Sequence, residues 1–196
     1  MKKLFGLMTT LLLLCACLGF VNPSTASADF PNRPVGLVIL DYSGNMDGKV
    51  YKTWRTVVKW AYHFPNYKIV DDNPKVGQIV REAVETGTKL SKTTMGDLAD
   101  KAGVDVLVVM PVYGCDYRII NSFGSWDGAG DMKYWTDARC KIFIYKKDGD
   151  KFSKKYISEW GIREMSDDYD PVDIIKWALC KEVNIMEGRP LIGRDL

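Results

Sequence analysis

A group of oxygen-bearing side chains follows the first apolar segment of this 196-residue chain. Asp41, Ser43 and Asn45 lie at alternate positions in the stretch DYSGNMDG, residues 41–48. Asp41 and Ser43 could offer a carboxylate and a hydroxyl oxygen to Mg²⁺, a hard cation that prefers such ligands, with Asn45 as a weaker third candidate. The same residue types are also ordinary turn residues. The sequence leaves both interpretations open and favours the turn.

Few residues are suited to catalysis. His63 is the only histidine, so a multi-histidine metal site is excluded, and its place at a predicted helix end is explained by the helix dipole. The densest carboxylates, Asp167, Asp168 and Asp170, are better explained as the segment that leads into a capped helix. No local pattern supports a catalytic pair of His63 with a distant cysteine. We therefore expect no enzyme, no catalytic residue and no cofactor.

Three cysteines lie beyond residue 28: Cys115, Cys140 and Cys180. An oxidising compartment would permit one disulfide bond. Cys115 and Cys140 fall on two successive predicted strands and could form it. The alternative is three buried thiols, because neighbouring strands often lack the Cα spacing that a disulfide needs.

A long segment, residues 121–136, combines aromatic residues with glycines and acids. We predict a loop there, and a loop of this length within a compact domain is often functional. Phe123, Trp126, Tyr134 and Trp135 are its candidate partner-binding residues, since Trp and Tyr are common interface anchors. Alternatively, these rings fold back on the sheet and complete the core.

The elements that must position these residues follow from apolar periodicity. The pattern predicts an α/β fold in the order β-α-β-α-α-β-β-β-α, a mixed sheet of about five strands covered by helices. The predicted strands are residues 35–40, 67–70, 104–112, 138–145 and 152–162. An Asp-Gly turn joins the last two strands, and the closing helix has Asp170 as its N-cap, Pro171 at its first position and Gly188 beyond its end.

The stretch Tyr67-Lys-Ile-Val-Asp-Asp72, two helices, and the stretch LADKAGVDVLVV of residues 98–109 resemble a known domain. It is similar to the α/β domain shared by the curli-secretion lipoprotein CsgG, the N-terminal domain of TolB and the lipoprotein activators of penicillin-binding proteins. The resemblance covers about residues 35–187 and implies a cell-envelope role in assembly or scaffolding. Its motifs describe packing rather than chemistry.

Residues 38–48 also resemble the metal-dependent adhesion motif of von Willebrand factor A domains, D-x-S-G-S-M-x-G. Asn45 replaces the second serine of that motif. Thr88 could imitate the family's loop threonine, but the apolar strand that ends at residues 109–113 has no aspartate where the family places one. The resemblance implies an alternative function, metal-dependent adhesion.

The first 28 residues are typical of an export signal, with Lys2 and Lys3, an apolar run over residues 4–21, and Ala26 and Ala28 at an A-x-A cleavage site. Residues 29–196 then form a single domain with no further membrane span. A lipid anchor through Cys17 is one alternative, and a retained membrane anchor is another.

The balance of basic and acidic residues limits the classes of partner that the protein can have. The chain has 27 basic and 25 acidic residues, so removal of the signal's two lysines leaves 25 of each. This balance argues against a nucleic-acid partner. We expect a periplasmic or extracellular protein that binds an envelope protein or a cell-wall component, with homo-oligomer formation open; a secreted hydrolase is the least favoured alternative.

Overall fold

The computed structural model describes residues 32–63, 65–70, 73–122, 131–164 and 170–191. These residues form one five-stranded sheet and four helices, in the predicted order. The elements are β1 (Arg33–Asp41), α2 (Gly48–Ala61), β2 (Tyr67–Ile69), α3 (Pro74–Glu85), α4 (Lys92–Ala102), β3 (Val106–Ser122), β4 (Asp131–Lys146), β5 (Lys151–Glu164) and α5 (Pro171–Glu187). The α/β class and the mixed sheet are confirmed.

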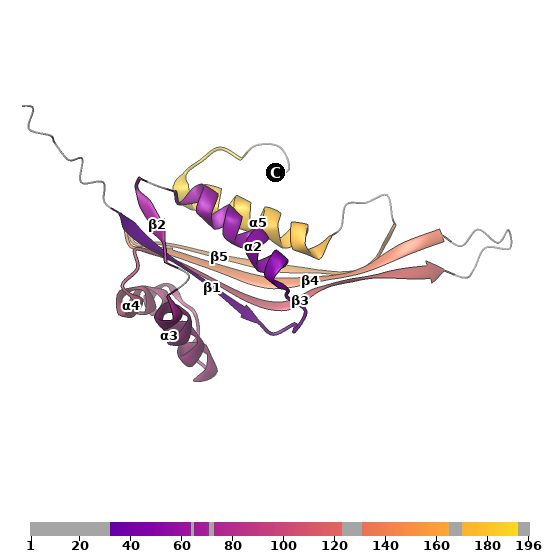
Figure 1. The fold of residues 1–196 in the computed structure, drawn as a ribbon, viewed down its shortest axis with the longest axis horizontal. Helices are drawn as coiled ribbons and strands as arrows, with labels where there is room; N and C mark the ends of the chain where they lie inside the picture. Colours follow the sequence, from indigo (N-terminus) through magenta and orange to yellow (C-terminus); the bar gives the residue numbers. More distant parts are fainter. Residues whose placement is uncertain (1–31, 64, 71–72, 123–130, 165–169, 192–196) are drawn as a thin grey trace, which may run out of the picture. The chain divides into compact units, whose positions relative to one another are not determined.

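The strand order in the sheet is β2-β1-β3-β4-β5. β1 is parallel to both β2 and β3, because helices connect these strands, whereas β4 pairs antiparallel with β3 and β5 pairs antiparallel with β4. Helices α2 and α5 cover one face of the sheet, and α3 and α4 cover the other (Figure 1). Among the described residues, no helix combines the length and apolar character needed to cross a membrane.

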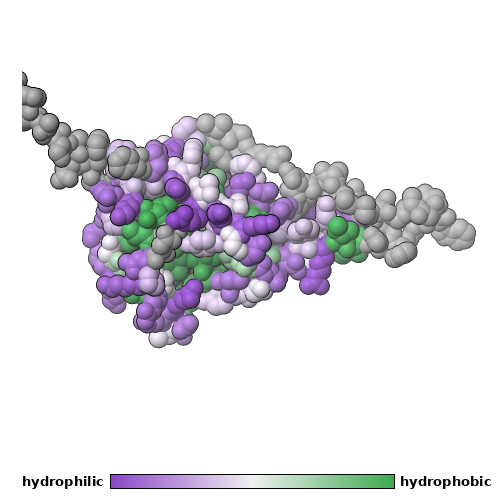
Figure 2. Space-filling view, in the orientation of Figure 1, coloured by the Kyte–Doolittle hydropathy of each residue, from purple (hydrophilic) through white to green (hydrophobic). Residues whose placement is uncertain are grey.

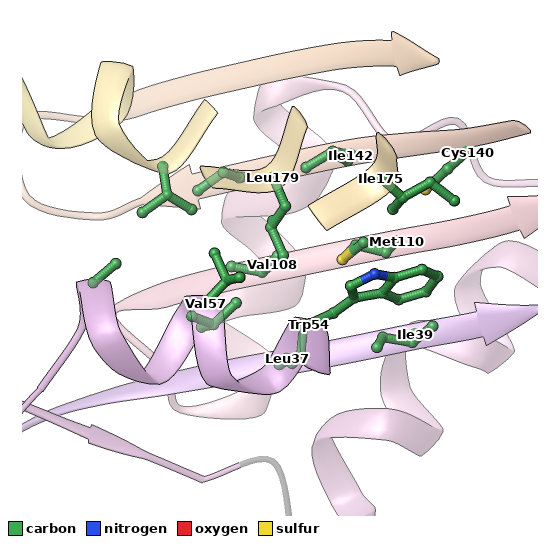
Figure 3. Packing of buried hydrophobic residues seen from close by; sticks show 14 of the residues in the cluster. Leu37, Ile39, Trp54, Val57, Val108, Met110, Cys140, Ile142, Ile175 and Leu179 are labelled. Atoms are coloured by element: carbon green, nitrogen blue, oxygen red, sulfur yellow. The ribbon is translucent and has the colours of Figure 1, made fainter. Parts of the chain in front are cut away.

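The larger core lies between the sheet and the α2–α5 layer (Figure 3). Alternate residues of β1, β3 and β4 point into it, as the period of two requires. Trp54 of α2 is fully buried there, and its indole Nε1–H donates a hydrogen bond of 3.0 Å to the Val172 carbonyl of α5. This bond ties the two helices of the layer together.

A smaller core lies on the opposite face of the sheet, beneath α3 and α4. Val76 and Val80 of α3, Met95 of α4, and Val109 and Phe143 of the sheet are among its buried residues. This second core occupies only part of the sheet face, which leaves the more distant part of β3–β5 without helical cover.

The ends of α5 follow the predicted chemistry. The carboxylate of Asp170 accepts a hydrogen bond from the Val172 N–H at the start of α5, with Pro171 at the first position. Gly103 and Gly188 end α4 and α5 in the left-handed conformation, which glycine adopts without steric cost.

The predicted loop over residues 121–136 is wrong in extent. β3 continues to Ser122 and β4 begins at Asp131, so Tyr134 and Trp135 lie within β4 rather than in a loop. The alternation expected of a half-buried strand is absent here because both faces of this part of the ribbon carry aromatic residues next to charged ones.

Candidate functional site

Beyond α3 and α4, the sheet face that they cover continues as an uncovered surface (Figure 1). Phe143 of β4 packs beneath the helices, and alternation places every second residue before it on this same face. We call this surface the open face. Among its described members are Tyr42, Tyr113, Asp116, Arg118, Lys133, Trp135, Asp137, Arg139, Lys141, Tyr156, Trp160 and Ile162.

Two tryptophans line a pocket of about 290 Å³ at the centre of the open face. The register places Asp137 opposite Trp160, and Trp135 opposite Ile162, so the two indoles are diagonal neighbours on adjacent strands. Trp160 is 68% exposed, and its ring is accessible to a ligand.

A charge pair completes the pocket. Arg139 donates two hydrogen bonds of 2.6 Å, from Nε and Nη2, to the two carboxylate oxygens of Asp137. The hydrogen bond to Asp137 is also the main reason that the pKa of Arg139 is raised. A bidentate pair of this kind holds the guanidinium in one orientation, with its remaining donors directed elsewhere.

Gly114 makes room for this charge pair. β3 and β4 change register between Val112 and Gly114, and a Cβ added at Gly114 would collide with the Asp137 carboxylate. Asp137 is 7% exposed because its side chain lies over this glycine. The bulge and the glycine therefore place a buried carboxylate between two tryptophans.

Stacked rings and a lysine extend the open face toward α3 and α4. Tyr42 and Tyr113 stack with ring centroids 5.4 Å apart. The Lys141 ammonium lies 5.2 Å from the centroid of the Tyr113 ring and 5.4 Å from that of Tyr156. At the other end, the Arg118 guanidinium lies 5.5 Å from the centroid of the Trp135 ring. Such contacts leave the cations close to the surface and order the rings around them.

The open face carries an excess of positive charge. Within residues 106–120 and 133–146 of β3 and β4, whose side chains the structure describes, it holds the cations Arg118, Lys133, Arg139 and Lys141, and the carboxylates Asp116 and Asp137. Each carboxylate already accepts a hydrogen bond from an arginine. The surface is thus suited to a ligand with apolar ring faces and negative charge.

The four predicted partner-binding aromatics do not form one group. Trp135 lies on the open face, whereas Tyr134 points to the opposite face and packs edge-on against Tyr117, with centroids 6.2 Å apart. Phe123 and Trp126 lie outside the described residues.

The residues that β5 contributes to the open face were not predicted from the sequence. Tyr156, Trp160 and Ile162 are separated by even numbers of residues and therefore share one face of that strand, while Ile157 points into the larger core on the other face. This alternation was visible in the sequence. Whether these residues join a binding surface depends on which strand pairs with β5, and the amino-acid pattern alone does not show that pairing.

Comparisons with known proteins concern the fold. No family model and no curated protein sequence matches this chain. The structure is distantly similar to the hypothetical protein CT253 from Chlamydia trachomatis (7% identity, TM-score 0.39, 79% of this chain and 94% of that one). It is also similar to PelC from Paraburkholderia phytofirmans, solved as a dodecamer (8%, 0.40, 81% and 89%), and to lipoprotein GNA1162 from Neisseria meningitidis (12%, 0.32, 78% and 99%). At such identities no residue role is transferred.

The residues Asp41, Ser43 and Asn45 form a hydrogen-bonded turn after β1. The Asp41 carboxylate accepts hydrogen bonds from the Ser43 hydroxyl at 2.6 Å and from the Ser43, Gly44 and Met46 amides at 2.9–3.3 Å. Partial burial alone would raise the pKa of Asp41, but these hydrogen bonds outweigh it and lower the pKa. Among the described residues, no three His, Cys, Asp or Glu side chains gather in a way that could hold a metal ion.

We predict that Mg²⁺ and Mn²⁺ leave the melting temperature of the protein unchanged. The oxygens of Asp41 and Ser43 that a cation would need are engaged within the turn, and a ligand that binds only the folded state must stabilise it. Thermal melts with and without 5–10 mM metal, about 100 times a weak Kd, test this. A metal-dependent rise that Asp41→Ala abolishes would instead establish the adhesion-type site.

Cys115 and Cys140 are free, buried thiols on the face of the sheet beneath α5. The register places Cys115 opposite Ala138 and Cys140 opposite Val112, so the two lie diagonally across β3 and β4. Burial raises the pKa of each thiol to about 12. Thiols of this kind are protonated at neutral pH and poor nucleophiles.

We predict that Cys115 and Cys140 resist alkylation in the native protein, because attack needs an accessible thiolate. Iodoacetamide at pH 8 followed by peptide mass spectrometry should label the half-buried Cys180 first and the other two only after unfolding. The same spectra detect a disulfide, the alternative that the sequence left open: a mass loss of about 2 Da on a peptide pair containing both cysteines would establish it.

Proposed function

We propose that this protein is an exported, non-enzymatic binding domain whose open face holds an anionic carbohydrate polymer of the cell envelope. The observation that carries the proposal is the pocket between Trp135 and Trp160, with Asp137 and Arg139 between the rings. Sugar rings present C–H groups that pack on aromatic faces, and their hydroxyls pair with a carboxylate and a guanidinium.

The form of the open face supports a polymer over a small ligand. Aromatic rings and cations recur from Tyr42 to Trp135 along β3–β5, and the surface is exposed rather than enclosed. Successive sugar units would meet successive rings, while acidic groups would meet Lys141, Arg139 and Arg118. Each contact is weak, and several in a row give useful affinity.

Export and the absence of catalysis, the two other parts of the proposal, are supported by the sequence, by the two buried cysteines and by His63. The export signal at residues 1–28 would place the domain where envelope polymers are found. The absence of catalysis is supported by the neutral, buried state of Cys115 and Cys140 and by His63, whose Nδ1 lies 3.0 Å from the Trp60 carbonyl at the end of α2.

Affinity electrophoresis tests the proposal. Native gels cast with polygalacturonate, an acidic polymer, should retard the protein, whereas gels cast with dextran, a neutral polymer, should retard it less. The retardation should weaken as salt rises from about 50 to 200 mM, because the charge contribution is screened. Equal retardation by both polymers would show that the cations of the open face do not contribute to binding, which would contradict the preference for an anionic polymer. Retardation by neither polymer would contradict the whole proposal.

A further inference from the structure

The edge of the sheet next to β2 is incomplete. β2 has three residues and pairs with β1 only from Arg33 to Val35, whereas β1 continues to Asp41. Among the described strands, none pairs with residues 36–41 of β1 on this side. A strand edge of about 20 Å, at about 3.3 Å for each residue, therefore has no paired strand among the described residues.

The direction of the β1 backbone groups follows from three hydrogen bonds. The Val35 carbonyl accepts from Val70 on the β2 side, while the Pro34 carbonyl accepts from Asp105, which leads into β3. Tyr42, after the end of β1, donates to Val112 of β3. Since consecutive residues of a strand point to opposite sides, Leu37 and Ile39 direct their N–H and C=O groups toward the incomplete edge.

A groove of about 570 Å³ runs along this edge. Leu37 and Ile39 form its base, Tyr51 of α2 lines one wall, and Gly77 and Arg81 of α3 line the other. Figure 2 shows hydrophobic residues in the middle of this view, over β1, with more hydrophilic surfaces on both sides. The side chains of Leu37 and Ile39 are buried beneath α2, so their main chains are what the groove presents.

The groove also lies where the helical connections diverge. α2 follows β1 on one face of the sheet, and α3 follows β2 on the other. Crevices at the carboxyl ends of parallel strands whose connections diverge in this way are the usual ligand sites of open α/β sheets. None of the residues that line this groove belongs to the open face.

We propose that the groove binds an extended peptide segment of a partner protein, which adds to β1 as a strand in line with β2. The peptide main chain would pair with the N–H and C=O groups of Leu37 and Ile39 and so continue the ladder that β2 begins. An isolated small molecule would leave most of this edge unpaired, whereas a strand of about six residues fills its length.

The walls of the groove indicate how the peptide side chains are accommodated. Alternate residues of the added strand would point toward α3, where an added Cβ at Gly77 meets nothing within 4 Å. This gap leaves room for a side chain of the peptide. The other residues would point toward Tyr51 and α2. The main chain provides most of the affinity, so we expect tolerance of many peptide sequences.

A blocking variant and a matched control define the test. Gly77→Phe places a ring in the groove at a position with open space, and a helix tolerates phenylalanine better than glycine. Lys75→Phe adds the same ring to an exposed position of α3 outside the groove. Ten-residue random peptides displayed on phage are selected on the full-length protein and counter-selected on Gly77→Phe.

The expected result is a set of peptides that bind the protein and Lys75→Phe equally and bind Gly77→Phe at least tenfold more weakly. Amide hydrogen exchange supplies the second readout. In the free protein the Leu37 and Ile39 amides should exchange faster than those of Val38 and Leu40, which face β3, and a synthetic selected peptide should slow the exchange of Leu37 and Ile39.

Three results would overturn the inference. The first is that no peptide distinguishes the protein from Gly77→Phe, or that selected peptides leave the two amides unprotected. The second is protection of Leu37 and Ile39 that rises with protein concentration alone, which would assign the edge to a second copy. The third is protection of the Leu37 and Ile39 amides at every protein concentration without peptide, which would show that a segment of this chain pairs with the edge.

Discussion

Replacing Trp54 by alanine should lower the free energy of unfolding by about 3–5 kcal/mol, the range for truncating a buried tryptophan. Trp54 is fully buried between α2, α5 and the sheet (Figure 3), and its indole N–H bonds the Val172 carbonyl. The substitution leaves a cavity and removes the hydrogen bond that joins α2 to α5. Because a domain of this size is stable by about 5–15 kcal/mol in total, the variant should unfold at much lower denaturant.

Trp60→Ala is the matched control for Trp54→Ala. Trp60 lies on the same helix but is 62% exposed, with the Arg189 guanidinium 5.6 Å from its ring centroid. We expect its loss to cost less than about 1 kcal/mol. Urea titrations of the two variants beside the parent compare the effects. Equal losses would show that the α2–α5 layer is not packed as described.

Removing the ammonium of Lys146 should destabilise the protein by about 3–5 kcal/mol. Lys146, at the end of β4, donates hydrogen bonds of 2.7 and 3.0 Å to the carboxylate of Glu187, at the end of α5. The side chains are 10% and 11% exposed. Burial alone would lower the pKa of Lys146, but the hydrogen bond to Glu187 is the chief reason that it is raised. Lys146→Met would therefore leave a buried carboxylate without its partner.

A double substitution distinguishes the cost of an unpaired Glu187 carboxylate from the cost of disturbed packing. Lys146→Met combined with Glu187→Leu removes both charges, and we expect it to recover most of the stability that the single variant loses. Lys147→Met is the exposed control, since the Lys147–Asp100 pair is more than half exposed and should contribute less than about 1 kcal/mol. A double variant as unstable as Lys146→Met would contradict the account of the pair.

The parts of the fold that the sequence predicted are those with local causes. Asp170 and Pro171 begin α5 and Gly188 ends it, and each cap interacts only with residues a few positions away along the chain. The order of helices and strands likewise followed from periodicity, because each element buries one face or one stripe.

The candidate site could not be predicted in the same way because its residues meet only through strand pairing. Trp135 and Trp160 become neighbours through the register of β4 and β5, and Asp137 lies in the pocket because β3 bulges between Val112 and Gly114 and leaves room over that glycine. The incomplete edge of β1 depends on the difference in length between β1 and β2, and periodicity places strand ends too loosely to show it.

The open face is tested most directly by measuring stability and binding together for Trp135→Ala/Trp160→Ala. We expect a free energy of unfolding within about 1 kcal/mol of the parent, because Trp160 is exposed and Trp135 only half-buried. The affinity for polygalacturonate should fall at least about thirtyfold, the value that corresponds to about 2 kcal/mol at an interface anchor. Trp60→Ala should retain the affinity. A double variant that binds as well as the parent, or that loses stability by about 3–5 kcal/mol, would contradict the assignment of the open face as the binding surface.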